Sequence, residues 1–414
     1  MTQDPTQGMS RASAPTPSPG ASAAAVIPPF SNHLPVRIRF GDGVAVELPE
    51  VIASHVARRV VVMVDDGLEE HNPGVAAAIE RLGEADIEME RFAKPPGEPT
   101  TDLVDAATEV LQRAAPRVVV AIGGGSVIDT AKAARLCAES RTSFQAWLDS
   151  DRRFPAPGVA LVAVPTTAGT GSEVSGGAVI THPDRARKIG IADATLRAQH
   201  ALVDPLLTHS VPAAMTAYTG VDALAQAIAG MIAKVRTPIG DGIALEAIRM
   251  IGRSLPVAFE NGENAAARSE MACGSLMAGL TMNISDCTAE HSLAQAIGGL
   301  FKLPHGLTIG LVLAETVERE RHHVPAILER VADALAVPDD GTGDGSRTVR
   351  GIRDLLARLQ FPVLGAVGVS EEHLDALTDI AQEDFFHTQS PVAWSRDELR
   401  AAFTAALAET ERAR

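Results

Sequence analysis

One carboxylate and two imidazoles, Asp222, His291 and His305, are the side chains of this sequence best suited to hold a metal ion. They belong to separate segments with helical spacing, so only the fold could bring them together. Carboxylate oxygen and neutral imidazole are ligands that ferrous iron and zinc accept, and three protein ligands leave one position open for substrate. Because an isolated histidine on an apolar helix is usually a core residue, the surrounding motifs decide the interpretation.

A glycine turn follows the apolar run 118–122, where the sequence reads Gly123-Gly124-Gly125-Ser126. Glycines let the backbone come close to a phosphate, and the free amides at the start of the next helix attract an anion. By itself such a triplet is more often a plain tight turn. A metal that polarises an oxygen and a turn that holds a pyrophosphate together indicate nicotinamide-dependent alcohol or carbonyl chemistry.

A second polar loop supports this interpretation. Residues 166–172 (TTAGTGS) follow the apolar run 159–164 and carry four hydroxyls and two glycines. Open parallel sheets bind ligands beyond the carboxyl ends of their strands, where two such loops would meet. Asp65 ends a further apolar run, and its carboxylate could accept hydrogen bonds from ribose hydroxyls and repel a 2′-phosphate. From its position alone, a helix N-cap is an equally good interpretation of Asp65.

The order of apolar and helical segments predicts an α/β fold. We predict strands over 36–40, 59–64, 86–92, 117–122 and 159–164, helices over 47–56, 74–83, 101–114 and 126–138, and short strands near 175–181, 188–192 and 201–204. This alternation is typical of a parallel sheet covered by helices on both faces. The rest of the chain has helical spacing, with a flexible loop over 338–345. The predicted parts are a disordered tail (1–28), a Rossmann-like dinucleotide-binding domain (29–208) and an all-helical metal and substrate domain (209–414).

Composition and charge narrow the class of protein. The chain has 414 residues, which is enough for two domains, and a net charge of −16, which argues against nucleic acid or an anionic membrane as the main partner. Three cysteines without paired spacing, Cys137, Cys273 and Cys287, fit a reducing, cytoplasmic location. Cys287 lies four residues before His291, and we expect it to pack rather than to bind metal. We expect no secretory signal and no membrane span.

Four motifs carry a resemblance to a known family. They are residues 123–132 (GGGSVIDTAK), 165–173 (PTTAGTGSE), 220–224 (GVDAL) and 304–306 (PHG). In their order and spacing they resemble the iron-containing (group III metal-dependent) alcohol dehydrogenase family. The resemblance implies a dehydroquinate synthase-like two-domain fold, with nucleotide and metal in the cleft between the domains.

The same resemblance implies NAD (NADH) as the cofactor. The positions that match nucleotide contacts are Gly124, Gly125, Ser126, Asp129, Thr166, Thr167, Thr170 and Lys188. Asp65 matches the position associated with a preference for NAD over NADP. For Lys188 the match places the ammonium near the nicotinamide ribose, whereas the alternative is an exposed, solvated lysine.

The resemblance also implies the metal ligands and shows one departure from the family. Asp222, His291 and His305 match ligand positions, but the family's histidine at position 226 is Gln226 here. Gln295 likewise stands where a further histidine is common. A glutamine oxygen is a weaker ligand than imidazole for zinc or ferrous iron, yet three ligands and an open position still make a catalytic site. We therefore expect a divalent metal, ferrous iron or zinc, with Gln226 as a weak fourth ligand.

The expected function is an NAD(P)-dependent alcohol dehydrogenase, or an aldehyde or ketone reductase, that acts on a small molecule as a homodimer or higher homo-oligomer. Three alternatives stay open. The first is a metal-independent reductase resembling maleylacetate reductase, and the second is a non-catalytic nucleotide-binding relative. The third is a cyclising lyase resembling dehydroquinate synthase, against which the loop 168–172 argues.

Overall fold

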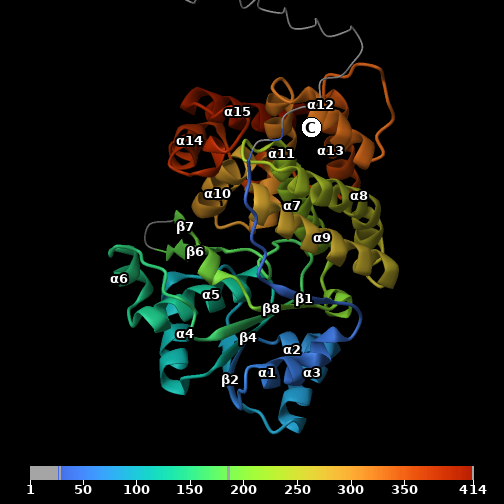
Figure 1. Cartoon of the computed structure of the whole chain (residues 1–414). Coiled ribbons are helices and arrows are strands. Elements are labelled where there is room, and N and C mark those ends of the chain that lie inside the picture. Colours follow the sequence, from blue (N-terminus) through green and yellow to red (C-terminus); the bar gives the residue numbers. More distant parts are fainter. Residues whose placement is uncertain (1–26, 28, 184–186, 413–414) are drawn as a thin grey trace, which may run out of the picture. The chain divides into compact units, whose positions relative to one another are not determined.

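The computed structural model describes residues 27, 29–183 and 187–412. The disordered tail predicted over 1–28 lies, apart from Ile27, outside this described part. Residues up to Asn32 form a unit of their own, and the fold described below belongs to the second unit, His33–Arg414. Within it, every described strand ends before residue 204, and the described elements that follow are helices (Figure 1). No described helix is both long and apolar enough to cross a membrane.

Six parallel strands form the main sheet. They are β1 (Arg37–Phe40), β2 (Arg59–Asp65), β3 (Glu88–Lys94), β4 (Val118–Gly123), β5 (Ala160–Pro165) and β8 (His200–Val203), in the order β1-β8-β5-β4-β2-β3. Because all six run in the same direction, their carboxyl ends meet at one edge of the sheet. β2, β4 and β5 are buried on both faces, which agrees with their nearly continuous apolar sequences, rich in valine in β2 and β4.

Helices cover both faces of this sheet. On one face lie α4 (Thr101–Ala114), α5 (Gly125–Ser140) and α6 (Phe144–Leu148), and on the other lie η1 (Val44–Glu47), α1 (Leu48–Ser54) and α3 (Pro73–Glu84), preceded by the short α2 (Leu68–His71). Alternate strand residues divide between the faces: Val61 and Val119 pack on the first group, Val62 and Val120 on the second. Full burial of such a side chain stabilises the fold by about 1.5–3 kcal/mol. The predicted α/β class is confirmed, although α2 and α6 were not predicted.

A separate hairpin lies outside the main sheet. β6 (Gly177–His182) and β7 (Arg187–Ala192) pair antiparallel with each other, and β7 packs against the helix α10 (Ala289–Phe301) (Figure 1). Both strands were predicted from the sequence, but their antiparallel pairing was not. The chain then passes through η3 (Ala194–Leu196), β8 and η4 (Pro205–Thr208) into the helical part.

The helical part is built around α7 (Ala213–Ile232). Around it lie α8 (Pro238–Glu260), α9 (Ala265–Ser285), α10 and α11 (His305–Glu320), followed by α12 (Pro325–Ala334), α13 (Ser346–Arg358), η5 (Leu364–Val367), η6 (Glu371–His373), α14 (Leu374–Gln382), η7 (Phe386–Thr388) and α15 (Arg396–Arg412). From Gly220 to its last residue, α7 is buried on every side, which explains its run of alanine and other small residues. The large helical core joins α7, α8, α9 and α11.

Two glycines let the α/β part and the helical part meet backbone to backbone. Gly171, in the loop after β5, has a φ of +62°, and a Cβ built there would collide with the Cα of Gly279 in α9. A Cβ at Gly279 would in turn lie 2.6 Å from the Cα of Gly171. Neither position can take a side chain without moving the two segments apart.

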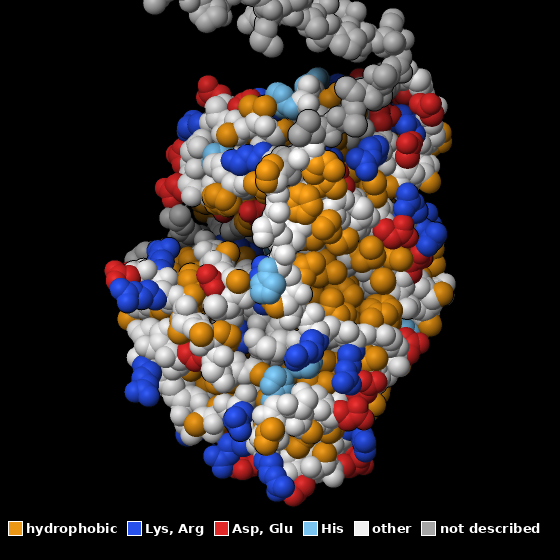
Figure 2. Space-filling model, viewed as in Figure 1, with side chains coloured by type: hydrophobic (Ala, Val, Ile, Leu, Met, Phe, Trp, Pro, Cys, Tyr) orange, Lys and Arg blue, Asp and Glu red, His pale blue; other side chains and the backbone are white. Residues whose placement is uncertain are grey.

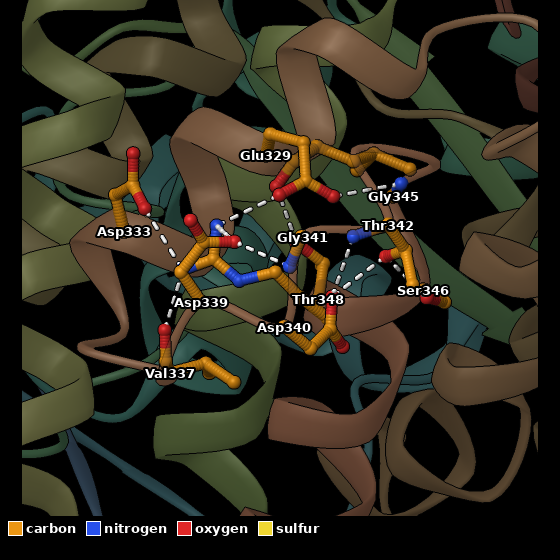
Figure 3. Close-up of polar contacts among 12 residues, drawn as sticks. Glu329, Asp333, Val337, Asp339, Asp340, Gly341, Thr342, Gly345, Ser346 and Thr348 are labelled. Atoms are coloured by element: carbon orange, nitrogen blue, oxygen red, sulfur yellow. Dashed lines mark hydrogen bonds and ion pairs between the residues drawn. The ribbon is translucent and has the colours of Figure 1, made fainter.

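The loop 338–345 between α12 and α13 is held by polar contacts that the sequence did not predict. The buried Arg347 donates to the carboxylates of Glu329 (2.7 Å) and Asp333 (2.9 Å) and to the carbonyl of Val337. Glu329 also accepts a hydrogen bond from the amide of Gly345 (2.8 Å). Figure 3 shows these carboxylates gathered beside the loop. We had expected this segment only as a flexible connection.

Candidate active site

A cavity of about 690 Å³ lies at the carboxyl edge of the sheet, where the start of α5 and the loop after β5 face α7, α10 and α11. The predicted site residues that line it are Gly125, Ser126, Asp129, Thr170, Lys188, Asp222, Gln226, His291 and His305. Asp65, Gly124, Thr166 and Thr167 are not part of its lining but belong to the same sheet edge. Five of the nine predicted nucleotide residues and all four predicted metal residues therefore line one cavity.

Asp222, His291 and His305 converge from three helices. The Nε2 atom of His291 lies 3.7 Å from Oδ1 of Asp222, and Nε2 of His305 lies 3.8 Å from the same oxygen. One ligand atom from each residue falls within 4.8 Å of the other two. An ion bound at about 2.0–2.2 Å from each donor needs ligand atoms separated by distances of this order.

The sequence Pro304-His305-Gly306 explains how His305 reaches this position. Pro304 takes the extended conformation before α11, and His305 is the first residue of the helix. A Cβ at Gly306 would collide with the backbone of Tyr218 in α7, so glycine is needed for the two helices to approach. This close packing sets His305 beside Asp222, one helical turn further along α7.

The buried carboxylate of Asp222 is only partly satisfied by the residues around it. The residue is 1% exposed, its Oδ1 atom has no hydrogen-bond partner among the described residues, and burial raises its pKa to about 6. An unpaired polar atom in such a place costs about 1–3 kcal/mol, and more if it is charged. Two imidazole nitrogens beside an orphaned carboxylate oxygen are the donor set of a divalent metal site, so the residues present fit the ion that the sequence implies.

Glu290 braces His291 and was missed by the sequence interpretation. Its Oε1 atom accepts a hydrogen bond from Nδ1 of His291 at 2.8 Å and another from the amide of Thr288 at 3.1 Å. Burial alone would raise the pKa of Glu290, but the hydrogen bonds from His291 and Thr288 lower it overall, so the group is a carboxylate. The hydrogen bond to Glu290 turns Nε2 of His291 towards Asp222. Burial alone would lower the pKa of His291, but Cys287 and Glu290 raise it well above its usual range, so Nε2 carries a proton that a bound metal ion would displace. The only signal in the sequence was an acid directly before His291.

We predict that Glu290→Ala weakens divalent-metal affinity by about 10- to 100-fold, because the imidazole loses the partner that fixes its tautomer and orientation. Glu290→Gln keeps an acceptor for Nδ1 and should lose less. Competition with a chromogenic chelator measures both affinities, and thermal unfolding of the metal-free proteins controls for damage to the fold. An unchanged metal affinity in a folded Glu290→Ala protein would contradict this role.

Gln226 and Cys287 also lie beside the three proposed ligands. The amide nitrogen of Gln226 donates to the carbonyl of Thr170 at 3.3 Å, which leaves its buried Oε1 atom without a partner among the described residues. That oxygen is available as a weak further ligand. The Sγ atom of Cys287 lies 3.6 Å from Nε2 of His291, and burial raises the pKa of this thiol to about 12, so it packs there as a neutral group.

At the nucleotide end, the two polar loops fit closely together at the start of α5. Gly124 is the N-cap, so the first amides of the helix carry no side-chain cap. A Cβ at Gly125 would lie 2.7 Å from both Oγ1 and Cγ2 of Thr170. The amide of Thr166 donates to the carbonyl of Gly123 at 3.0 Å, which ties the second loop to the first. Free amides at a helix start that only glycine leaves accessible form a cradle for a pyrophosphate.

We predict that Gly125→Ala lowers the stability of the protein by about 1–3 kcal/mol and weakens NADH binding, because the added carbon displaces the Thr170 loop. Gly124→Ala is the matched control for stability, since its Cβ would lie 3.5 Å from Thr167, an ordinary contact; Gly124 is itself a proposed nucleotide contact, so this variant is not a control for NADH binding. Thermal unfolding and fluorescence titration with NADH measure the two effects. Equal behaviour of the two variants would show that the contact with Thr170 is unimportant.

Asp65, at the end of β2, has a buried cationic partner that the sequence did not reveal. Lys94 is its direct neighbour on β3 and is 1% exposed. The Nζ atom lies 3.2 Å from Oδ1 of Asp65 and donates to the carbonyls of Pro95 and Gly97, both at 2.8 Å. All three ammonium protons are thus used, and the carboxylate is held at the sheet edge, where Oδ2 would lie 2.9 Å from a Cβ at Gly123.

We predict that Asp65→Gly raises the NADPH:NADH ratio of kcat/KM by about tenfold or more. Removing the carboxylate ends its repulsion of a 2′-phosphate and leaves the Lys94 ammonium without an anionic partner. Adding Lys94→Met should abolish most of the gain, because no cation is then left for the phosphate. Steady-state kinetics with both cofactors test this, and equal use of NADH and NADPH by the unaltered protein would contradict the assignment of Asp65.

Lys188 and Asp129 both line the cavity, and polar contacts hold each of them in place. Only 3% of the Lys188 side chain is exposed, and its Nζ lies 3.3 Å from Oε2 of Glu98, so the alternative of an exposed, solvated lysine is wrong. Asp129 accepts hydrogen bonds from Oγ of Ser172 at 2.5 Å and from the amide of Val179 at 2.9 Å. Its carboxylate therefore fastens the wall of the cavity, whatever contact it makes with a nucleotide.

Comparison with known proteins agrees with this geometry. The family described as iron-containing alcohol dehydrogenase matches residues 35–205, and its C-terminal part, described as Fe-containing alcohol dehydrogenase family, C-terminal, matches residues 216–407. The choline dehydrogenase of Bacillus subtilis (strain 168) is 32% identical over 358 residues, covering 85% of this chain and 89% of its own length. The probable alcohol dehydrogenase EutG of Escherichia coli (strain K12) is 34% identical over 351 residues, covering 84% and 87%.

A solved structure also resembles this chain in fold. The sulfoacetaldehyde reductase from Bifidobacterium kashiwanohense, solved in complex with NAD+, superposes with a TM-score of 0.82 at 28% identity, over 91% of this chain and 98% of that chain. The fold, the cavity and these relatives define an oxidoreductase that acts on CH–OH groups. The chain belongs to the iron-containing alcohol dehydrogenase family, which implies NAD(H) and an iron-like metal as its cofactors.

Proposed function

We propose that this chain interconverts a small alcohol and its aldehyde or ketone, with NAD rather than NADP as cofactor and with a divalent ion held by Asp222, His291 and His305. In the oxidative direction, alcohol and NAD+ give the carbonyl compound, NADH and a proton. The orphaned Oδ1 atom of Asp222 between two imidazoles, in the same cavity as the cradle of α5, is the observation that carries the proposal. When bound, the ion would act as a Lewis acid on the substrate oxygen and the nicotinamide would exchange the hydride.

The protein's own residues supply binding and orientation. The α5 amides at Gly125 and Ser126 would hold the pyrophosphate, and Asp65 the adenosine ribose. Lys188, kept in place by Glu98, would face the nicotinamide ribose from β7. Burial, Lys188 and His291 together lower the pKa of His305 well below its usual range, so this imidazole is neutral and its lone pair is free to act as a ligand.

A metal-independent reductase is the second candidate. Gln226 and Gln295, both lining the cavity where the family has histidines, favour it, because a site with fewer imidazoles binds metal less tightly. Against it, Asp222 would then stay buried without a cation. Removal of the metal separates the two candidates.

We predict that exhaustive chelation abolishes alcohol oxidation and that ferrous iron or zinc restores it. His305→Ala should lose both metal and activity, because only two strong ligands remain. Gln226→His should tighten metal binding by adding an imidazole, without necessarily raising turnover. Metal analysis and an NADH assay measure these effects. Full turnover in a verified metal-free sample would contradict the metal-dependent function and support the metal-independent reductase.

We also propose a cytoplasmic homodimer. The three cysteines are free, which suits a reducing compartment. β1 is an edge strand of the sheet, and its Ile38 and Phe40 are exposed. Figure 2 shows further hydrophobic side chains gathered on the face over α8 and α9, and Ile239 in α8 is 48% exposed. An unpaired edge and an apolar face are features that a symmetric partner would cover.

For assembly, we predict that light scattering gives a mass of at least twice 43.2 kDa. Charged substitutions on the exposed edge strand, Ile38→Glu with Phe40→Lys, should shift the protein towards the monomer, because a hydrophobic contact is replaced by solvated charge. A monomeric unaltered protein over the micromolar range would contradict the dimer.

A further inference from the structure

Two carboxylates face the cavity beyond the proposed metal ligands, and the mechanism does not use them. Asp286 follows the last residue of α9 with a φ of +66°, and Asp384 lies in the turn between α14 and η7. Burial, with a contribution from the nearby Asp384, raises the pKa of Asp286. Two segments that are about 100 residues apart thus each place a carboxylate on the wall of one cavity, where the two charges repel each other and a cation would offset the repulsion.

Aromatic rings form the adjoining wall. The ring of Phe386 lies edge-on to the imidazole of His291, with the ring centroids 5.6 Å apart. Phe385 and Phe386 stand at 61° to each other with centroids 6.2 Å apart. Phe385 is 59% exposed at the cavity, although a large apolar side chain of this kind gains nothing for folding there. Two rings meeting at an angle beside carboxylates are the surroundings that recognise ammonium groups.

The turn that carries these groups is fixed to the proposed metal site. Ser292, next to His291, donates its hydroxyl to Oδ1 of Asp384 at 2.6 Å and accepts the amide of His387 at 2.8 Å. The amide of Phe386 donates to the same Oδ1 atom at 2.9 Å. Asp384 is therefore preorganised, with its hydrogen bonds from the described residues on one oxygen and its other oxygen left for a ligand.

Apart from the proposed metal site, the basic side chains of the cavity lie elsewhere. Among the described lining residues the only lysine and arginine are Lys188, which is paired with Glu98, and Arg152, which follows α6 on the α/β side. The relatives do not decide the charge of the substrate either, since choline is a cation and sulfoacetaldehyde is an anion. The charge of the substrate must therefore be inferred from the residues of this chain.

We propose that the substrate is an amino alcohol or quaternary ammonium alcohol, or the corresponding aldehyde, whose cationic nitrogen lies between Asp286, Asp384 and the rings of Phe385 and Phe386. This inference rests on the proposed function, because it places the reacting oxygen at Asp222, His291 and His305. In a compact molecule, two or three bonds separate the oxygen-bearing carbon from the nitrogen. The cation offsets the repulsion between the two carboxylates, and an anionic substrate would add to it.

The test compares alcohols of one shape and different charge. Choline and 3,3-dimethylbutan-1-ol are isosteres, with a quaternary nitrogen in one and a quaternary carbon in the other, and 2-hydroxyethanesulfonate supplies the opposite charge. We expect kcat/KM of the metal-loaded enzyme for choline to exceed that for the neutral isostere by about tenfold or more. A choline-to-isostere ratio near one, or a preference for the sulfonate, overturns the proposal.

Substitutions test whether Asp286 and Asp384 cause the preference for choline. Asp384→Asn and Asp286→Asn keep the oxygen that accepts the existing backbone hydrogen bond and remove the charge, so each should lower the choline-to-isostere ratio by about tenfold. Asp354→Asn, the same change at an exposed position on α13, should leave the ratio unaltered. An unchanged ratio in both pocket variants would overturn the assignment.

A binding measurement separates this proposal from the proposed function. If no alcohol is oxidised and no aldehyde is reduced, the proposed function fails. Calorimetric titration of choline and of 3,3-dimethylbutan-1-ol into the NAD-bound protein then decides the charge preference independently. Tighter binding of choline supports the cation site, and equal or weaker binding rejects it.

Discussion

The structure of this site depends on one carboxylate. Asp222 is buried in the middle of the most buried helix of the helical part, and one of its oxygens has no hydrogen-bond partner among the described residues. Burial without a full set of hydrogen bonds is unfavourable for a carboxylate, and the divalent ion that we propose between Asp222, His291 and His305 would offset this cost. Gly306, which admits α11 against Tyr218, and Glu290, which braces His291, position the two imidazoles beside Asp222.

The parallel sheet provides the nucleotide side of the site. Because its strands end at a common edge, the loops after β2, β4 and β5 can be polar without disturbing the core. Two glycines after β4 are required by contacts, since a Cβ at Gly125 would collide with Thr170 and a Cβ at Gly123 with Val127 and Asp65. The proposed site for the hydride carrier thus comes from the α/β part of the chain and the proposed ligands of the ion from the helical part, and the two meet in the cavity.

Much of the fold and the centre of the site were predictable from the sequence. Valine runs and alternating helices predict the parallel sheet. Asp222 and His305 were proposed as ligands because each lies in a short local motif, and His291 because its position matches a ligand position of the family. The groups that were missed act across long separations in sequence. Lys94 lies beside Asp65 only because β2 and β3 pair in this register. Glu98 reaches Lys188 only because the hairpin of β6 and β7 lies beside the segment that carries Glu98. Asp384 and Asp286 carry no motif at all. Pairings of this kind are fixed by tertiary packing, and no local pattern encodes them.

The contact between Gly171 and Gly279 has a mechanical consequence. At this point the backbones of the two walls touch with no side chain between them, so they cannot come closer. A side chain introduced at either position would push the walls apart beside Gln226, whose Oε1 atom would lie 3.5 Å from a Cβ at Gly171. The part of the cavity that Gln226 and Asp222 line would widen with it.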